Sequence, residues 1–202
     1  MKLYYAPGAC SLTAHIVLQE TGLEYEVVLV NLETRIAEGG SLLETVNPKG
    51  YVPVLELENK QTLTEVTAIV QYLAELVPDH QLVPTTGGLV RARLQEWLGF
   101  ISTELHKPFG FLYNPSVSED SKKIISERIM QRLSFIEEQL ANQDYLLGSQ
   151  YSVADAYLFN ILFWAGGFGF DLTKLESLTA FRDRMAARPA VHAVLKQEGL
   201  AA

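Results

Sequence analysis

The first thirty residues alternate between strand and helix, and this order constrains the fold more than any other feature of the chain. Residues 3–5 are strand-like, and the apolar spacing over residues 11–21 predicts a helix that ends at Gly22. Residues 25–30 form a nearly continuous apolar run, which predicts a strand buried on both faces. A strand, a helix and a strand at this spacing form a βαβ unit with parallel strands and a right-handed crossover.

The rest of the first eighty residues completes an α/β domain. The predicted elements are a short helix at 41–45, a hairpin of strands 51–57 and 61–63, and a helix at 64–77. Thr64 is the expected N-cap of the last helix. The order βαβ, α, ββα is the thioredoxin-like arrangement, so we predict such a domain over residues 1–80.

Beyond residue 80 the strand patterns stop. Residues 81–88 read as a linker, and residues 89–202 then carry apolar residues at helical spacing, which predicts an all-helical bundle domain. Helices are expected at 89–106, at 119–141, behind residue 152, near 174–187 and near 190–197. Ser152 and Asp155 fit the two partners of a capping box, so we assign them to folding rather than to chemistry.

Composition and charge exclude several classes of protein. The net charge of −8 argues against nucleic acid or an anionic membrane as the main partner. One cysteine excludes an internal disulfide framework, and no apolar run reaches the ~18 residues of a membrane span. The N-terminus lacks a signal-peptide pattern. The sequence therefore predicts a soluble cytoplasmic protein, and we predict neither a metal nor a cofactor.

Cations are scarce in the first eighty residues, which hold 4 Lys/Arg against 11 Asp/Glu. Each is therefore a candidate for holding an anionic ligand. Lys2 and Lys60 are assigned to the surface, which leaves Arg35 and Lys49.

The only cysteine, Cys10, follows the Pro7–Gly8 loop at the start of the first predicted helix. Unpaired N–H groups and the helix dipole stabilise an anion there, so we expect a lowered pKa for the Cys10 thiol. The alternative is a small buried hydrophobe. A CxxC redox motif needs a second cysteine at position 13, where Thr13 stands. A dithiol oxidoreductase is therefore excluded, whereas a monothiol mechanism is not.

Two further places in the first domain suit a peptide ligand. If the strand edge at Val52 stays unpaired ahead of Pro53, its backbone can bind an extended peptide by strand addition. Pro53 is also a candidate for a cis bond. The N–H groups of Glu65 and Val66 at a helix start form a carboxylate site, although an acidic residue there also stabilises the helix itself.

The helix at 89–106 carries Gly99, Thr103 and His106 nearly opposite its apolar stripe. This face either borders a ligand cleft or faces solvent. The next segment holds three aromatic residues that either line an apolar pocket or pack internally: Phe109, Phe111 and Tyr113.

Together and in order, these motifs resemble the cytosolic glutathione transferases, most closely the bacterial beta class. The resemblance covers essentially the whole chain, and its specificity comes from the order and spacing of motifs that are weak singly. They are Lys2–Tyr5 with Pro7–Leu12, Asn47–Gly50 with Val52–Leu55, Thr64–Glu65 with Ala68–Leu73, Glu104–Lys107, and Ser152–Phe159.

The resemblance implies that the first domain binds glutathione as a co-substrate. It places Cys10 next to the glutathione sulfur, with which it can form a mixed disulfide in this class, and Val52, before a cis Pro53, against the peptide backbone. The other implied contacts are Glu65 and Val66 for the γ-glutamyl end and Arg35 for the glycyl carboxylate. Thr103, Glu104 and His106 are implied to reach a glutathione, either of the same or of the neighbouring subunit, with His106 near the thiol. The resemblance also implies a homodimer.

Two positions depart from the family pattern, and a third is assigned a different role from its counterpart in other classes. Gly99 stands where close relatives carry Asn, and Pro108 replaces a usual Gly. Tyr5 occupies the neighbourhood of the catalytic tyrosine of other classes and is interpreted as structural.

The predicted function is conjugation of the glutathione thiol to hydrophobic electrophiles, a detoxification reaction. Cys10 and His106 are the predicted catalytic residues, and either Cys10 or the Ser11 hydroxyl is expected to hydrogen-bond the glutathione sulfur. The apolar electrophile would lie against Phe109, Phe111 and Tyr113. Two alternatives stay open: thiol–disulfide or peroxide reduction through a Cys10 mixed disulfide, and a non-catalytic carrier of apolar ligands.

Overall fold

The computed structural model describes residues 1–200, which form two compact units. The first unit comprises Met1–Gln81 together with the segment that begins at Ala187, and the second comprises Leu82–Ala186. The C-terminal segment thus groups with the first unit, whereas the sequence analysis places it in the helical domain 89–202.

The first unit is built on a five-stranded mixed sheet with the order β3-β2-β1-β4-β5. Its strands are β1 (Lys2–Tyr5), β2 (Glu26–Asn31), β3 (Ile36–Ala37), β4 (Val54–Glu56) and β5 (Thr62–Thr64). β1 pairs in parallel with β2, with Leu3 opposite Val27, and antiparallel with β4, with Leu3 opposite Leu55. The predicted βαβ unit and hairpin are therefore confirmed. The two-residue β3 is too short for a periodic sequence signal.

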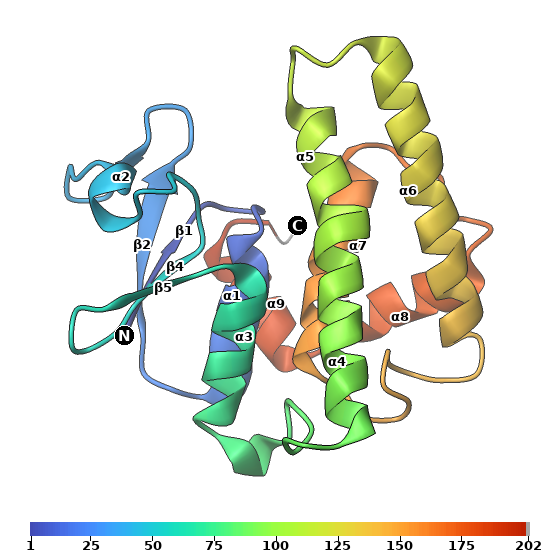
Figure 1. The fold of residues 1–202 in the computed structure, drawn as a ribbon, viewed down its shortest axis with the longest axis horizontal. Helices are drawn as coiled ribbons and strands as arrows, with labels where there is room; N and C mark the ends of the chain where they lie inside the picture. Colours follow the sequence, from blue (N-terminus) through green and yellow to red (C-terminus); the bar gives the residue numbers. More distant parts are fainter. Residues whose placement is uncertain (201–202) are drawn as a thin grey trace. The chain divides into compact units, whose positions relative to one another are not determined.

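Helices cover both faces of this sheet, α1 (Ser11–Thr21) and α3 (Val66–Glu75) on one side and α2 (Leu43–Val46) on the other (Figure 1). A 3₁₀ turn at Pro78–His80 follows α3. α1 has the predicted bounds, and Gly22 ends it with a left-handed φ of 65°. One core contains the fully buried Leu3, Leu12, Ile16, Leu55, Ile69 and Leu73. The opposite face is closed by Tyr4, Ala6, Val30, Ala37, Leu43, Val52 and Val54.

The prediction that the second strand is buried on both faces is wrong. Val27 and Leu29 are 39% and 43% exposed, whereas Val30 is 2% exposed. Successive side chains of a strand point to opposite faces, and Val28 and Val30 take the face that packs against the cluster around Tyr4. β2 lies beside the short edge strand β3, so its other face is less covered than the centre of the sheet.

The predicted N-cap at Thr64 is also wrong. Thr64 is the last residue of β5, and Glu65 takes the N-cap position with φ 71° and ψ 121°. The strand therefore turns into the helix at a single residue. A positive φ is uncommon for a residue with a Cβ, and such residues concentrate at functional sites.

The last helix, α9 (Pro189–Gln197), packs against α1 within the first unit. Arg188 donates two hydrogen bonds to the Glu20 carboxylate, from Nε at 2.7 Å and from Nη2 at 3.1 Å. A bidentate pair of this kind is among the stronger surface-proximal contacts. It is one physical reason why the C-terminal segment groups with the first unit.

The second unit is helical. Its helices are α4 (Leu89–Phe100), a π-helical segment (Ile101–His106), α5 (Lys107–Tyr113), α6 (Glu119–Leu140), α7 (Val153–Gly167) and α8 (Glu176–Ala186). α4 and α5 continue each other as one rod, with α6 alongside (Figure 1). The predicted capping box is confirmed, because Ser152 and Asp155 make both of its reciprocal bonds. Within residues 1–200, no helix has the length and apolar character needed to cross a membrane.

The fourth helix does not end at His106 as predicted, but continues to Tyr113. The Lys107 N–H donates to the Ser102 carbonyl, five residues back, which is the π-helical pattern. A proline inside an α-helix lacks an N–H and clashes with the carbonyl four residues earlier. The wider turn before Pro108 accommodates the proline, and the helical rod therefore continues past the predicted end of the helix.

Candidate active site

Cys10 occupies the N-cap position of α1, and its Sγ donates to the Val52 carbonyl at 3.1 Å. Burial raises the pKa of the Cys10 thiol to about 12, and the Glu65 carboxylate adds to the rise. Hydrogen bonds from the backbone N–H groups of Cys10 and Ser11 lower the pKa, but by less than burial raises it. The expected lowered pKa is therefore wrong: desolvation outweighs the helix terminus. Cys10 is a neutral thiol that can donate a hydrogen bond.

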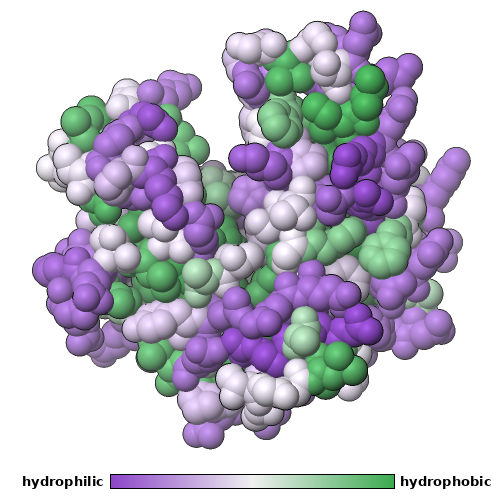
Figure 2. All heavy atoms as spheres, in the orientation of Figure 1, coloured by the Kyte–Doolittle hydropathy of each residue, from purple (hydrophilic) through white to green (hydrophobic). Residues whose placement is uncertain are grey.

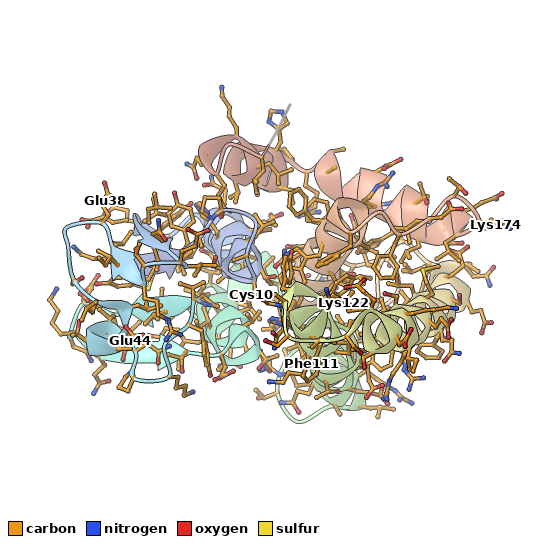
Figure 3. The ribbon with its side chains drawn as sticks, turned by 90° about the horizontal axis from the view of Figure 1, so that it is seen from above. Cys10, Glu38, Glu44, Phe111, Lys122 and Lys174 are labelled. Atoms are coloured by element: carbon orange, nitrogen blue, oxygen red, sulfur yellow. The ribbon has the colours of Figure 1, made fainter. Side chains whose placement is uncertain are left out.

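The Ser11 hydroxyl is fully buried and closes the loop that precedes Cys10. It accepts from the Ala6 N–H and donates to the Ala6 carbonyl, both at 3.1 Å. The Ser11 hydroxyl proton is therefore already donated to the Ala6 carbonyl. The predicted alternative, in which this hydroxyl donates to a ligand sulfur, has no proton left for that bond. In Figure 3 Cys10 lies on the side of the first unit opposite Glu38 and Glu44.

The Val52–Pro53 peptide bond is cis, and Pro53 directly precedes β4. The Val52 carbonyl accepts from Cys10, whereas no hydrogen bond to the Val52 N–H occurs within residues 1–200. This backbone segment therefore has the unpaired donor that strand addition by a peptide requires.

The Glu65 carboxylate is held by two residues of its own unit, and one of them, Tyr51, is not a sequence candidate for the site. Its Oε1 accepts from Lys49 Nζ at 2.7 Å and from the Tyr51 hydroxyl at 2.5 Å. Hydrogen bonding to Glu65 raises the pKa of both Lys49 and Tyr51. Lys49 is a sequence candidate for an anionic ligand, and the structure gives it a carboxylate of its own chain. Val66, buried, begins α3 directly behind.

Arg35 is also engaged within the first unit. Its Nη2 donates to the Gly50 carbonyl at 2.7 Å, and its Nη1 lies 2.9 Å from the Glu44 carboxylate. Gly50 has φ 73°, and a Cβ there would lie 2.9 Å from Arg35 Nη2. The positive φ calls for glycine at position 50, whereas the guanidinium is the end of a flexible side chain that can move aside.

In the second unit, His106 ends the π-helical segment. Its Nδ1 lies 2.5 Å from the hydroxyl of Tyr157, which is 1% exposed, and its ring meets Trp164 edge-on at 5.0 Å. Tyr157 is a second contact that the sequence pattern does not reveal, because it lies 51 residues away on another helix. It fixes the orientation of the imidazole.

Thr103 and Glu104 precede His106 in the same segment. Thr103 is exposed, and its hydroxyl donates to the Gly99 carbonyl at 3.0 Å. Glu104 accepts from Arg128 and Arg132, each at 2.9 Å, and these hydrogen bonds lower the pKa of the Glu104 carboxyl. Its carboxylate is therefore paired within the second unit.

The aromatic residues of α5 divide into two groups. Phe109 is fully buried and Tyr113 is 61% exposed, and both join a cluster of rings. The cluster comprises Phe109, Tyr113, Trp164, Phe168 and Phe170, with neighbouring ring centroids 4.6–6.3 Å apart. Phe111 is 47% exposed and lies outside this cluster. Two of the three predicted pocket residues are thus brought together.

The chain matches two family models, "Glutathione S-transferase, N-terminal domain" over residues 8–76 and "Glutathione S-transferase, C-terminal domain" over residues 100–189. A curated relative, glutathione S-transferase GstA of Escherichia coli O157:H7, is 43% identical over 99% of this chain and 100% of its own length.

Solved structures agree. The ternary complex of BphK, a bacterial GST, superimposes with a TM-score of 0.97 at 48% identity, over 99% of this chain and 100% of that one. Two further structures match at 43% identity over the full length of both chains. They are a sphingomonad glutathione S-transferase complexed with glutathione (TM-score 0.95) and the beta class enzyme of Sphingomonas chungbukensis (TM-score 0.96).

A thioredoxin-like unit, a helical unit and these matches define an enzyme of the glutathione-transferring class. The chain belongs to the glutathione S-transferase family, and its structural neighbours include bacterial beta class members, as the sequence motifs predict.

Proposed function

We propose that this glutathione transferase conjugates glutathione to hydrophobic electrophiles, with the Cys10 thiol as hydrogen-bond donor to the glutathione sulfur. The observation that carries the proposal is the neutral Cys10 thiol beside the cis Val52–Pro53 peptide. The nucleophile is a thiolate, and a donor at hydrogen-bond distance stabilises it. Cys10 then donates a hydrogen bond to the glutathione sulfur and forms no covalent bond with glutathione or the electrophile.

The tripeptide would lie along the first unit. The unpaired Val52 N–H would pair with the peptide backbone, beside Pro53. The Glu65 carboxylate and the Val66 N–H would bind the γ-glutamyl ammonium and carboxylate, and Arg35 the glycyl carboxylate. The family resemblance also assigns Thr103, Glu104 and His106 to glutathione, and we propose these roles for them. His106 acts as a base or as an electrostatic partner of the thiol, with its ring oriented by Tyr157.

The electrophile site is proposed at the aromatic cluster of the second unit. Phe109 and Tyr113 offer apolar ring surface there, together with Trp164, Phe168 and Phe170. Exposed Phe111 at the same helix adds apolar surface. Such a surface suits an apolar substrate of generic shape.

The homodimer is proposed on the surface between α4 and α6. A groove of about 630 Å³ is lined there by Trp97, Phe100 and Phe135, whose rings lie 5.5–6.1 Å apart, and by Leu89 and Val90. Leu89 and Val90 are 72% and 56% exposed, and Figure 2 shows apolar patches near the start of α4. Apolar surface of this kind marks protein interfaces. A cytoplasmic role in detoxification completes the proposal.

Thiol–disulfide exchange is the competing function. In that reaction the Cys10 thiolate attacks oxidised glutathione, the mixed disulfide forms, and one glutathione thiolate leaves. A pKa of about 12 makes the Cys10 thiolate scarce at neutral pH, which favours conjugation over exchange.

Activity assays separate these functions. Glutathione-dependent turnover of an activated aryl halide should persist at a reduced rate in Cys10→Ala and be largely retained in Cys10→Ser, whose hydroxyl is a donor. An absence of both turnover and glutathione binding in the wild type would refute conjugation. Loss of all turnover in Cys10→Ser, with a rapid glutathione adduct in the wild type by mass spectrometry, would favour exchange.

A further inference from the structure

A buried carboxylate from the C-terminal segment reaches the turn that carries Cys10. Glu198 follows α9 directly and is 6% exposed. Its Oε2 accepts from the Gly8 N–H at 2.9 Å, across 190 residues of sequence. Its Oε1 lies 2.7 Å from Nδ1 of His15, whose side chain is 1% exposed. A carboxylate only accepts, so the imidazole donates from Nδ1.

The surroundings make these contacts strong. The rings of Tyr5 and Tyr25 each meet the His15 ring edge-on with centroids 5.6 Å away. Burial, and secondarily the Glu198 charge, raises the pKa of both tyrosines. In such a low-dielectric site, a charge-assisted hydrogen bond is stronger than in water, and an N–H that loses its acceptor is costly.

The Gly8 contact acts on a conformationally demanding turn. Gly8 has φ 68°, and Cys10 follows two residues later. The Ala9 N–H donates to the Ala6 carbonyl at 3.0 Å, and the Ser11 hydroxyl accepts from the Ala6 N–H and donates to the Ala6 carbonyl. These bonds are local, whereas Glu198 anchors the turn to a distant helix.

We propose that Glu198 is a positioning residue for the glutathione reaction: it holds the Gly8–Cys10 turn so that the Cys10 sulfur stays against the Val52 carbonyl. The inference rests on the proposed role of Cys10 as partner of the glutathione sulfur. The C-terminal segment then belongs to the machinery of the glutathione site as well as to the packing of the unit.

The chain offers a matched control for helix docking. The Glu20–Arg188 pair also fixes the C-terminal segment on α1, across 168 residues of sequence, and its two hydrogen bonds join α1 directly to the residue before α9. Glu20→Gln therefore loosens the segment without changing the turn. Glu198→Ala removes both contacts of the carboxylate, and Glu198→Gln keeps an acceptor for Gly8 without the charge.

The experiment measures alkylation of Cys10 by iodoacetamide, together with kcat and KM for glutathione, in the full-length variants. Glu198→Ala should alkylate ~10-fold faster at neutral pH, because a released thiol is less buried and ionises more readily. Its KM for glutathione should rise about tenfold, with a smaller change in kcat. Glu198→Gln should change in the same direction by less, and Glu20→Gln by under about twofold.

Equal changes of the alkylation rate and of KM in Glu20→Gln and in the Glu198 variants would overturn the inference. Docking of the C-terminal helix would then explain the changes without the Gly8 contact. Wild-type values in both Glu198 variants would overturn it as well. If Glu198→Ala does not fold, the comparison of Glu198→Gln with Glu20→Gln decides. Glutathione should slow alkylation of the wild-type protein, and a failure to do so would refute the proposed role of Cys10 rather than that of Glu198.

Discussion

The Cys10 thiol donates to the Val52 carbonyl, and burial keeps it neutral, with a pKa of about 12. Its place at a loop-to-helix junction is visible in the sequence and is confirmed, because Pro7 and Gly8 end the strand and α1 begins at Ser11. The direction of its pKa shift is not visible, because it depends on burial and on the Val52 carbonyl, 42 residues away. A local rule for helix termini is outweighed here by desolvation.

The pH dependence of Cys10 alkylation tests this assignment. A thiol whose pKa is about 12 ionises ~10-fold more for each added pH unit throughout the neutral and mildly alkaline range. We therefore expect the alkylation rate to rise with a slope near one, without a plateau, until the protein unfolds. Free glutathione, measured in parallel, should level off near its own pKa. A plateau for Cys10 at neutral pH would contradict the account.

At the scale of elements, the rod of α4, the π segment and α5 combines confirmed and wrong predictions. The helical periodicity locates the start of α4 at Leu89, whereas the π-helical turn that carries the rod past Pro108 is not predicted. A proline indicates a local irregularity of the helix. Which irregularity forms depends on the packing of His106 and Phe109 against α7. That packing is tertiary and leaves no local sequence signal.

Gly99 and Gly110 provide a matched pair of helical glycines on this rod. A Cβ at either position would meet open space. Gly99→Ala and Gly110→Ala are each expected to raise the free energy of unfolding by roughly 0.5–1 kcal/mol, because alanine is the better helix former. Urea denaturation measures both. Destabilisation by Gly99→Ala alone would show that position 99 lies against another surface.

A larger side chain at position 99 tests the face that carries Thr103 and His106. If this face contacts glutathione, Gly99→Asn should lower the KM for glutathione, whereas Gly99→Ala should leave it unchanged. An equal KM in the two variants would indicate a solvent face at this position.

The capping box of α7 is an element-scale prediction about stability. Asp155 is buried and accepts from the N–H groups of Ser152 and Leu146, both at 2.8 Å. Asp155→Ala leaves these donors unpaired and should lower the free energy of unfolding by about 2–4 kcal/mol. Chemical denaturation measures this change. The control is Asp171, which is exposed and accepts hydrogen bonds from the Thr173 N–H and hydroxyl. A similar loss in Asp171→Ala would contradict the argument.

At the scale of the whole molecule, the order of elements predicts the thioredoxin-like and helical parts, and family motifs predict their class. The grouping of α9 with the first unit escapes prediction, because it depends on pairs such as Arg188 with Glu20, which are far apart in sequence. The site residues Tyr51 and Tyr157 escape for the same reason. Periodicity reports the local element, whereas these roles come from long-range contacts.

A charged substitution in the α4–α6 groove tests the proposed homodimer. Phe135 lines the groove, whereas Ile124 is 67% exposed on the same helix and does not line it. Phe135→Glu should convert a dimer to a monomer in light-scattering chromatography, because a buried unpaired charge is costly. Ile124→Glu should leave the mass unchanged. A monomeric wild type, or equal effects of the two substitutions, would contradict the proposed interface.

Whether glutathione, and not Cys10, is the ionised sulfur is tested by the ultraviolet absorbance of thiolate in the purified protein, recorded against pH with and without glutathione. We expect no thiolate signal from the protein alone at neutral pH. A signal should appear when glutathione binds, and Cys10→Ala should move its apparent pKa upward without abolishing it. A thiolate band in the protein alone that disappears in Cys10→Ala would show that Cys10 itself is the ionised sulfur and would contradict the account.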